Sequence, residues 1–177
     1  MSENMNVPEK EALAAAIEME RKGYNFFNDT AEKATNQMAK DVFKFLAQEE
    51  LNHIKAIENF NQQFLSGGAA DADKFIDQMI ADRPLAAIND LFKNLSKSAP
   101  VEGGDVEAYQ FAMDFERRGG EFYKKAEEAA TDSNAKKLFK FLVGEEQKHF
   151  KVVESCLTYI ENPEEFFRQQ EKWHLEG

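Results

Sequence analysis

The sequence predicts an all-α protein: an antiparallel four-helix bundle built from a duplicated helical hairpin. Residues 11–60 and 107–156 align without gaps at an offset of 96 residues and share 21 identities in 50 positions. The 177 residues include only nine glycines and four prolines, which suits long helices. Apolar residues recur at helical spacing in both copies. Two such hairpins would place equivalent residues on opposite sides of one central core.

The first hairpin is expected over residues 9–66. Pro8 suits the start of a helix, and the apolar stripe that follows runs to about residue 34. A second helix is expected from residue 36 to residue 66. Gly67 and Gly68 follow it, and glycine commonly ends a helix.

Residues 67–104 break the helical pattern and are expected to connect the two hairpins. Glycine pairs bound this stretch, and two X-Pro pairs interrupt it. Short helical pieces are expected at about 71–82 and 85–97, where apolar residues return to helical spacing. A partly helical connection of this length can return along a long helix.

The second hairpin is expected over residues 105–161, with helices at about 106–130 and 133–161. Thr131, Asp132 and Ser133 supply cap-type residues between them. One bundle domain is therefore expected over residues 1–161. Residues 162–177 are expected to form a C-terminal tail or short helix that docks on the bundle or on a neighbouring subunit.

Each hairpin carries one lone glutamate and one Glu-x-x-His motif at matching positions. Residues i and i+3 are neighbours on a helix, so the Glu and His of each motif can reach one ion together. The lone glutamates lie on the facing helices and are expected to bind or bridge the ions. This ligand set is the one described for di-iron bundles, and its donors also suit manganese or zinc. The predicted metal ligands are Glu20, Glu50, His53, Glu116, Glu146 and His149.

The alternative interpretation is that these six residues are surface charges. Three observations argue against it. The pattern recurs at a fixed offset, it uses two of only three histidines, and all six positions fall on apolar stripes. Ionisable groups on a buried face must be compensated, which a metal ion can do.

Other positions near the predicted ligands leave alternatives open. Glu49 and Glu145 also recur, and are expected either to support a ligand or to be solvated or bridge helices. Tyr24 and Tyr123 are expected to hydrogen-bond a ligand, to relay an electron or to pack in the core, and core packing is favoured. Cys156 is expected to be a buried small hydrophobic residue.

Composition excludes several classes of function. The formal charge of −11 argues against nucleic acid as a partner. A single cysteine excludes a disulfide framework and a Cys-x-x-Cys metal site within these residues. The sequence lacks a signal-peptide pattern and an apolar stretch of about 18 residues, so no membrane contact and a cytoplasmic location are expected.

These motifs resemble those of the rubrerythrin-like branch of the ferritin-like superfamily. The resemblance covers residues 9–161 and rests on Glu20-Arg21-x-Gly23, on its repeat at 116–119 and on the two Glu-x-x-His motifs. It implies a ferritin-like bundle with a long connection between the hairpins and a centre of two iron ions. It also implies reduction of hydrogen peroxide or dioxygen in oxidative-stress defence, and a homodimer.

The sequence departs from that family in two respects. It lacks the paired Cys-x-x-Cys motifs of a rubredoxin-like domain, so electrons would come from an external donor protein such as a rubredoxin, or from Fe(II) itself. Met113 stands where the family has an extra glutamate, and Ile17 is its equivalent in the first hairpin. A ferroxidase or iron-storage protein is therefore the alternative function. A metal-free helical interaction module is the alternative of another class.

Overall fold

The computed structural model of this chain describes residues 7–65, 72–81 and 106–176. Within those ranges the chain forms helices joined by short turns and contains no strand. This confirms the expected all-α, ferritin-like bundle. The helices are α1 (Val7–Lys33), α2 (Gln37–Leu65), α3 (Ala72–Ala81), α5 (Val106–Ala129), α6 (Ser133–Glu161) and α7 (Pro163–Glu176).

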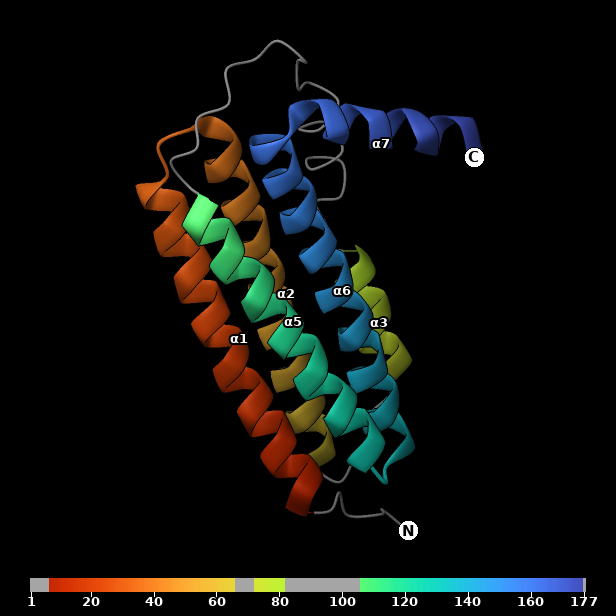
Figure 1. Ribbon diagram of the computed structural model, residues 1–177. Coiled ribbons are helices and arrows are strands. Elements are labelled where there is room, and N and C mark those ends of the chain that lie inside the picture. Colours follow the sequence, from red (N-terminus) through yellow and green to blue (C-terminus); the bar gives the residue numbers. More distant parts are fainter. Residues whose placement is uncertain (1–6, 66–71, 82–105, 177) are drawn as a thin grey trace.

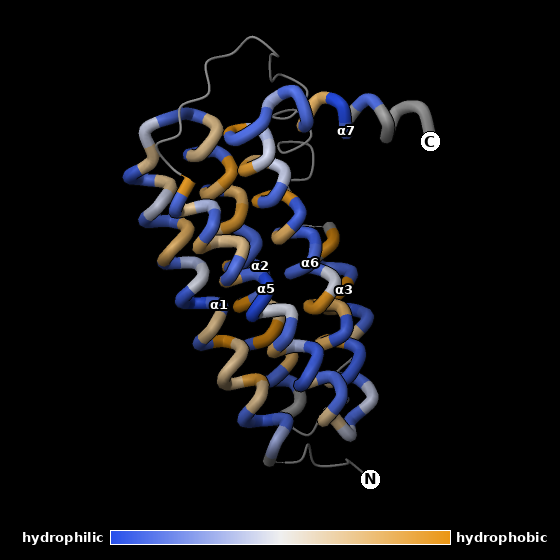
Figure 2. Tube along the Cα trace, in the orientation of Figure 1, coloured by the Kyte–Doolittle hydropathy of each residue, from blue (hydrophilic) through white to orange (hydrophobic). Residues whose placement is uncertain are grey.

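Four long helices lie side by side and form two antiparallel hairpins (Figure 1). Helices α1 and α6 run in one direction, and α2 and α5 run in the other (Figure 1). These helices contain 24 to 29 residues, which corresponds to about 36–44 Å of length. Hydrophilic and hydrophobic residues alternate along each of them, as an amphipathic bundle requires (Figure 2).

The turn between α5 and α6 is held by two carboxylates. Asp132 accepts hydrogen bonds from the backbone N–H groups of Asn134 and Ala135, at 2.9 and 2.7 Å, and so caps α6. Glu9, only 2 % exposed, reaches the same turn from the start of α1. Its Oε1 accepts from the backbone N–H and hydroxyl of Thr131, at 2.5 and 2.8 Å, and from the Asp132 N–H at 2.8 Å. These bonds fix α1 against the second hairpin.

Two apolar clusters fill the bundle, one toward each end. One cluster includes Phe27, Phe43 and Tyr109, and the other includes Leu13 and Phe139. The segments that contribute to them lie on either side of the middle of each long helix. The polar residues singled out from the sequence fall in those middle segments, between the two clusters.

Helix α3 packs on α2 and α6, which confirms the helical piece expected at about 71–82. Its Phe75 ring lies 6.0 Å from that of Phe60, and its Asp73 pairs with Lys137 at 2.9 Å. The piece expected at 85–97 lies outside the described residues.

Helix α7 begins directly after α6 and docks on the bundle through its first turns. Phe166 is buried, and its ring lies 5.3 Å from that of Tyr159 on α6. The rest of α7 points away from the long axis of the bundle (Figure 1). Among the helices described, none is both long enough and apolar enough to cross a bilayer.

Candidate metal centre

The six predicted ligands come together in the middle of the bundle, and each is at most 2 % exposed. Helices α1 and α5 supply one glutamate each, and α2 and α6 supply one glutamate and one histidine each. They form two groups, and in each group one donor atom from every residue lies within 4.8 Å of the others. The first group is Glu20, Glu50, His53 and Glu146, and the second is Glu50, Glu116, Glu146 and His149.

The two groups share Glu50 and Glu146, the glutamates of the two Glu-x-x-His motifs. Glu20 and Glu116 each belong to one group only. The sequence left binding and bridging as alternatives for the lone glutamates, and the geometry gives the shared position to the motif glutamates. The reason is helix packing, because Glu50 on α2 and Glu146 on α6 project from contacting helices of the two hairpins toward the same central space.

Both imidazoles direct Nδ1 toward the carboxylates. The Nδ1 of His53 lies 3.2 Å from an oxygen of Glu20 and 3.6 Å from one of Glu146. The Nδ1 of His149 lies 3.5 Å from an oxygen of Glu116 and 3.7 Å from one of Glu50. Each ring therefore presents one nitrogen to the space that its own group encloses.

Burial disfavours the charged form of three of these carboxylates, Glu50, Glu116 and Glu146. Burial, followed by the charges of neighbouring carboxylates, raises the pKa of Glu50 and of Glu146 well above the ordinary value. Burial, with the charge of Glu20, raises the pKa of Glu116 to about 8. Several buried donor atoms make no hydrogen bond, namely one oxygen each of Glu50 and Glu146, both oxygens of Glu116 and both nitrogens of His149.

The arrangement fits a pair of divalent metal ions. Four ionised carboxylates carry four negative charges, and two divalent cations would neutralise them in a site that water does not reach. Cations would also supply partners for the buried atoms that make no hydrogen bond. Carboxylate oxygen and neutral imidazole are donors that iron and manganese accept. The cluster can therefore hold metal.

The two lone glutamates have different surroundings although their sequence positions match. The hydroxyl of Tyr123 donates a short hydrogen bond to Glu20, across the two hairpins. Burial alone would raise the pKa of Glu20, but His53 and the hydrogen bonds that Glu20 accepts lower it instead. The residue that corresponds to Tyr123 in the first hairpin is Phe27, which has no hydroxyl to offer Glu116. Tyr123 therefore hydrogen-bonds a predicted ligand, which was one of the alternatives for the two tyrosines. Tyr24 is half-buried and packs against the apolar cluster that contains Phe27.

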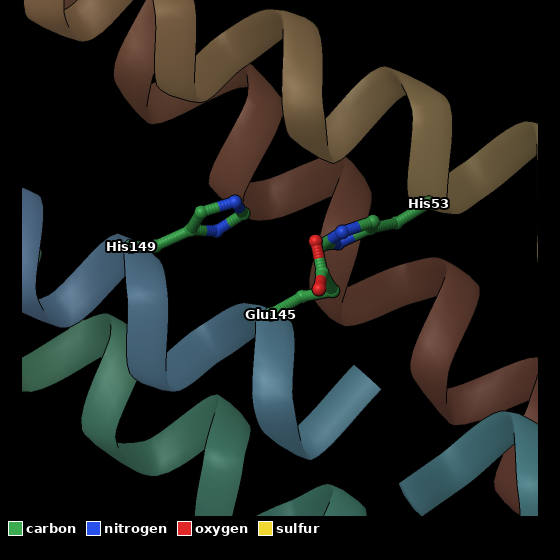
Figure 3. Close-up of side chains that lie close together, drawn as sticks. All are labelled: His53, Glu145 and His149. Carbon is green, nitrogen blue, oxygen red and sulfur yellow. The ribbon is translucent and has the colours of Figure 1, made fainter. Parts of the chain in front are cut away.

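Glu49 and Glu145 lie on the inner side of the bundle, 3 % and 2 % exposed. An oxygen of Glu49 lies 3.8 Å from Nε2 of His149, on the opposite hairpin. Glu145 of α6 extends to the ring of His53 on α2, and the two imidazole rings face each other 5.3 Å apart (Figure 3). Of the two alternatives, this placement favours support of a ligand, because each carboxylate lies near the histidine of the other hairpin.

Two glycines belong to the site, a role that the sequence analysis missed. A Cβ atom on Gly23 would lie 2.5 Å from Oε2 of Glu50, and one on Gly119 would lie 3.1 Å from Oε2 of Glu146. Each glycine therefore makes room for the carboxylate of a shared ligand. The sequence feature that could have indicated this role is that a glycine follows each lone glutamate by three residues.

Cys156 is fully buried, as expected, and burial raises the pKa of its thiol.

The chain matches no curated protein and no solved structure. The rubrerythrin family model matches residues 11–157, which span both hairpins and all six predicted ligands. This chain belongs to the rubrerythrin family.

Proposed function

We propose that this protein is a two-iron oxidoreductase that reduces hydrogen peroxide, or dioxygen, in defence against oxidative stress. The observation that carries the proposal is the overlap of the two ligand groups at Glu50 and Glu146. Shared carboxylates hold two ions close together, which suits the transfer of two electrons to one small oxidant. Membership of the rubrerythrin family supports iron as the metal.

Two bound ferrous ions would supply the two electrons that, together with two protons, reduce one hydrogen peroxide to two waters. The chain's own residues prepare the site for that role. Four carboxylates balance the charge of the ions, and Tyr123 orients Glu20 through its hydroxyl. The apolar clusters at either end limit the access of water to the centre.

The electrons would come from an external donor protein such as a rubredoxin. The one cysteine of these 177 residues is buried in the core, and an iron site of the rubredoxin type requires four cysteines. We further propose a cytoplasmic homodimer. A metal-free interaction module is disfavoured, because it would leave the buried carboxylates without compensation.

A ferroxidase or iron-storage protein is the second candidate, and one observation favours it. Met113, which stands where the family has an extra glutamate, is half-buried and packs against an apolar cluster. Ile17, its counterpart in the first hairpin, packs against the other cluster. No carboxylate is therefore available at either position to exchange with another ligand during turnover.

The test is stopped-flow oxidation of protein loaded anaerobically with two Fe(II), mixed with peroxide or with air-saturated buffer. Oxidation much faster with peroxide, and restored after re-reduction, is expected of a peroxidase. Fast reaction with dioxygen and continued oxidation of added Fe(II) would move the function to iron handling. Glu146→Gln and His149→Ala should lose the reaction, and full activity in either variant would refute the assignment.

A further inference from the structure

A cavity of about 340 Å³ opens between α5 and α6 of the second hairpin, and two residues of the candidate metal centre help to line it. Its buried lining residues are Glu116 and Glu146, a lone glutamate and a shared glutamate of the centre. Its volume is far larger than one water or peroxide molecule requires. The cavity therefore lies on the solvent side of the group that contains Glu116, whose carboxylate oxygens are themselves buried.

Gly120 is the residue that leaves this space open between α5 and α6. A Cβ atom on it would meet only the Cβ of Glu146, at an ordinary contact distance of 3.6 Å, so a longer side chain has room to project into the cavity. The corresponding residue of the first hairpin is Tyr24, at the offset of 96 residues. The first hairpin thus carries a bulky ring, packed against an apolar cluster, at the position where the second hairpin has no side chain. The duplicated hairpins thus differ at the residue that decides access.

The charges at the mouth of the cavity point to the class of molecule that passes. Arg117 is exposed and paired with Glu121 at 2.7 Å and with Asp114 at 2.6 Å. Lys124 and Lys151 add two positive charges to the rim, in a protein whose formal charge is −11. A locally positive mouth repels divalent cations and admits small neutral or anionic molecules.

We propose that this cavity, which we name the Gly120 channel, is the route by which a small neutral or anionic oxidant reaches the metal centre. The inference rests on the proposed function, since it assigns the path of that function's substrate. It also gives the two halves of a duplicated site different roles. Oxidant reaches the Glu116 side, and Tyr24 fills the corresponding position on the Glu20 side.

The test uses azide as an anionic probe and Co(II) in place of iron, so that binding is read from the visible absorption spectrum. Gly120→Leu fills the channel from α5, and Val143→Phe fills it from α6. Gly144→Leu is the matched control, because a Cβ atom there meets nothing within 4 Å and Gly144 does not line the channel. All three variants should bind two Co(II) per chain with the wild-type spectrum.

Both channel variants should slow azide association by about ten-fold or more, because binding then requires the helices to open. Gly144→Leu should associate at the wild-type rate. Azide association at the wild-type rate in both channel variants would overturn the proposal, as would failure of azide to bind the Co(II) protein at all. If the wild type binds azide through the channel but its iron form does not react with peroxide or dioxygen, the proposed function fails while the channel stands.

Discussion

Replacing Gly23 by alanine should abolish binding of two metal ions while the bundle still folds. The new methyl group would lie 2.5 Å from Oε2 of Glu50, whereas ordinary contact begins at 3.4 Å. The carboxylate must therefore move by the difference, 3.4 − 2.5 = 0.9 Å. Metal–ligand distances tolerate only about ±0.2 Å, so a displaced Glu50 cannot serve both groups.

The same methyl group would meet the ring of Phe115 at 2.7 and 2.9 Å, and that ring is only half-buried. Overpacking of this kind costs typically about 1–3 kcal/mol, which a bundle of this size can absorb. The metal-free variant should therefore unfold cooperatively at lower denaturant than the wild type. Its far-ultraviolet circular dichroism should remain that of a helical protein.

Two further glycines provide a graded comparison. Gly119→Ala requires a shift of Glu146 of only 3.4 − 3.1 = 0.3 Å, so weaker binding of two ions is expected rather than loss. Gly144→Ala places its methyl group where nothing lies within 4 Å. That change should stabilise α6 by about 1 kcal/mol through helix propensity and leave metal binding unchanged.

The assay is anaerobic titration with Co(II), followed by absorption and by metal content after desalting. The expected order of affinity is wild type and Gly144→Ala together, then Gly119→Ala, then Gly23→Ala. If Gly23→Ala bound two ions per chain as tightly as the wild type, the close approach of Glu50 would not position the centre. The assignment of Glu50 as a shared ligand would then be wrong.

Three other outcomes follow from the same geometry. Tyr123→Phe removes the hydroxyl that pairs with buried Glu20 and should destabilise the metal-free protein by about 1–3 kcal/mol in urea denaturation, whereas Tyr24→Phe should change little. Glu9→Ala removes three hydrogen bonds to the α5–α6 turn and should cost about 2 kcal/mol by the same measurement; equal stability would show that the turn holds without it. The raised pKa of Glu116, about 8 against an ordinary 4.5, means that the native metal-free protein retains a proton that the unfolded chain releases above about pH 4.5. The stability of the metal-free protein should therefore fall by up to about 1.4 kcal/mol per pH unit between pH 5 and 8, as measured by thermal unfolding. Bound metal would displace the proton from Glu116, so the metal-loaded protein should not show this loss.

The repeat in the sequence was sufficient to predict the fold and the six residues that meet at its centre. When polar residues interrupt the apolar stripes at matching places in two hairpins, they are expected to lie together in the middle of the bundle. The Glu-x-x-His spacing also fixed which His accompanies each Glu, because residues i and i+3 share a helix face. The helical period of the apolar residues and the repeat offset of 96 residues thus predict which face of its helix each ligand occupies.

Relations across helices could not be read from the sequence. The bond from Tyr123 to Glu20 joins α5 to α1, and it depends on how the two hairpins rotate against each other. The same holds for Glu49, whose neighbour His149 lies on the opposite hairpin. The reach of Glu9 from α1 to the α5–α6 turn is a third case, since it joins residues more than 120 apart in the chain. Helical periodicity predicts which face a side chain occupies, but not its neighbour on another helix.

The positions where the two hairpins differ are as informative as those where they agree. Near Glu116 the second hairpin has Gly120 where the first has Tyr24, and a cavity lies beside Gly120. The hydroxyl of Tyr123 serves Glu20, and its counterpart Phe27 leaves both oxygens of Glu116 without a hydrogen bond. Both differences give the Glu116 side fewer protein contacts than the Glu20 side: Glu20 accepts a hydrogen bond from Tyr123, whereas Glu116 accepts none and a cavity lies beside it. Duplication thus accounts for the two matching halves of the ligand set, and divergence accounts for their unequal surroundings, with Glu20 held by a hydrogen bond from Tyr123 and Glu116 left without one.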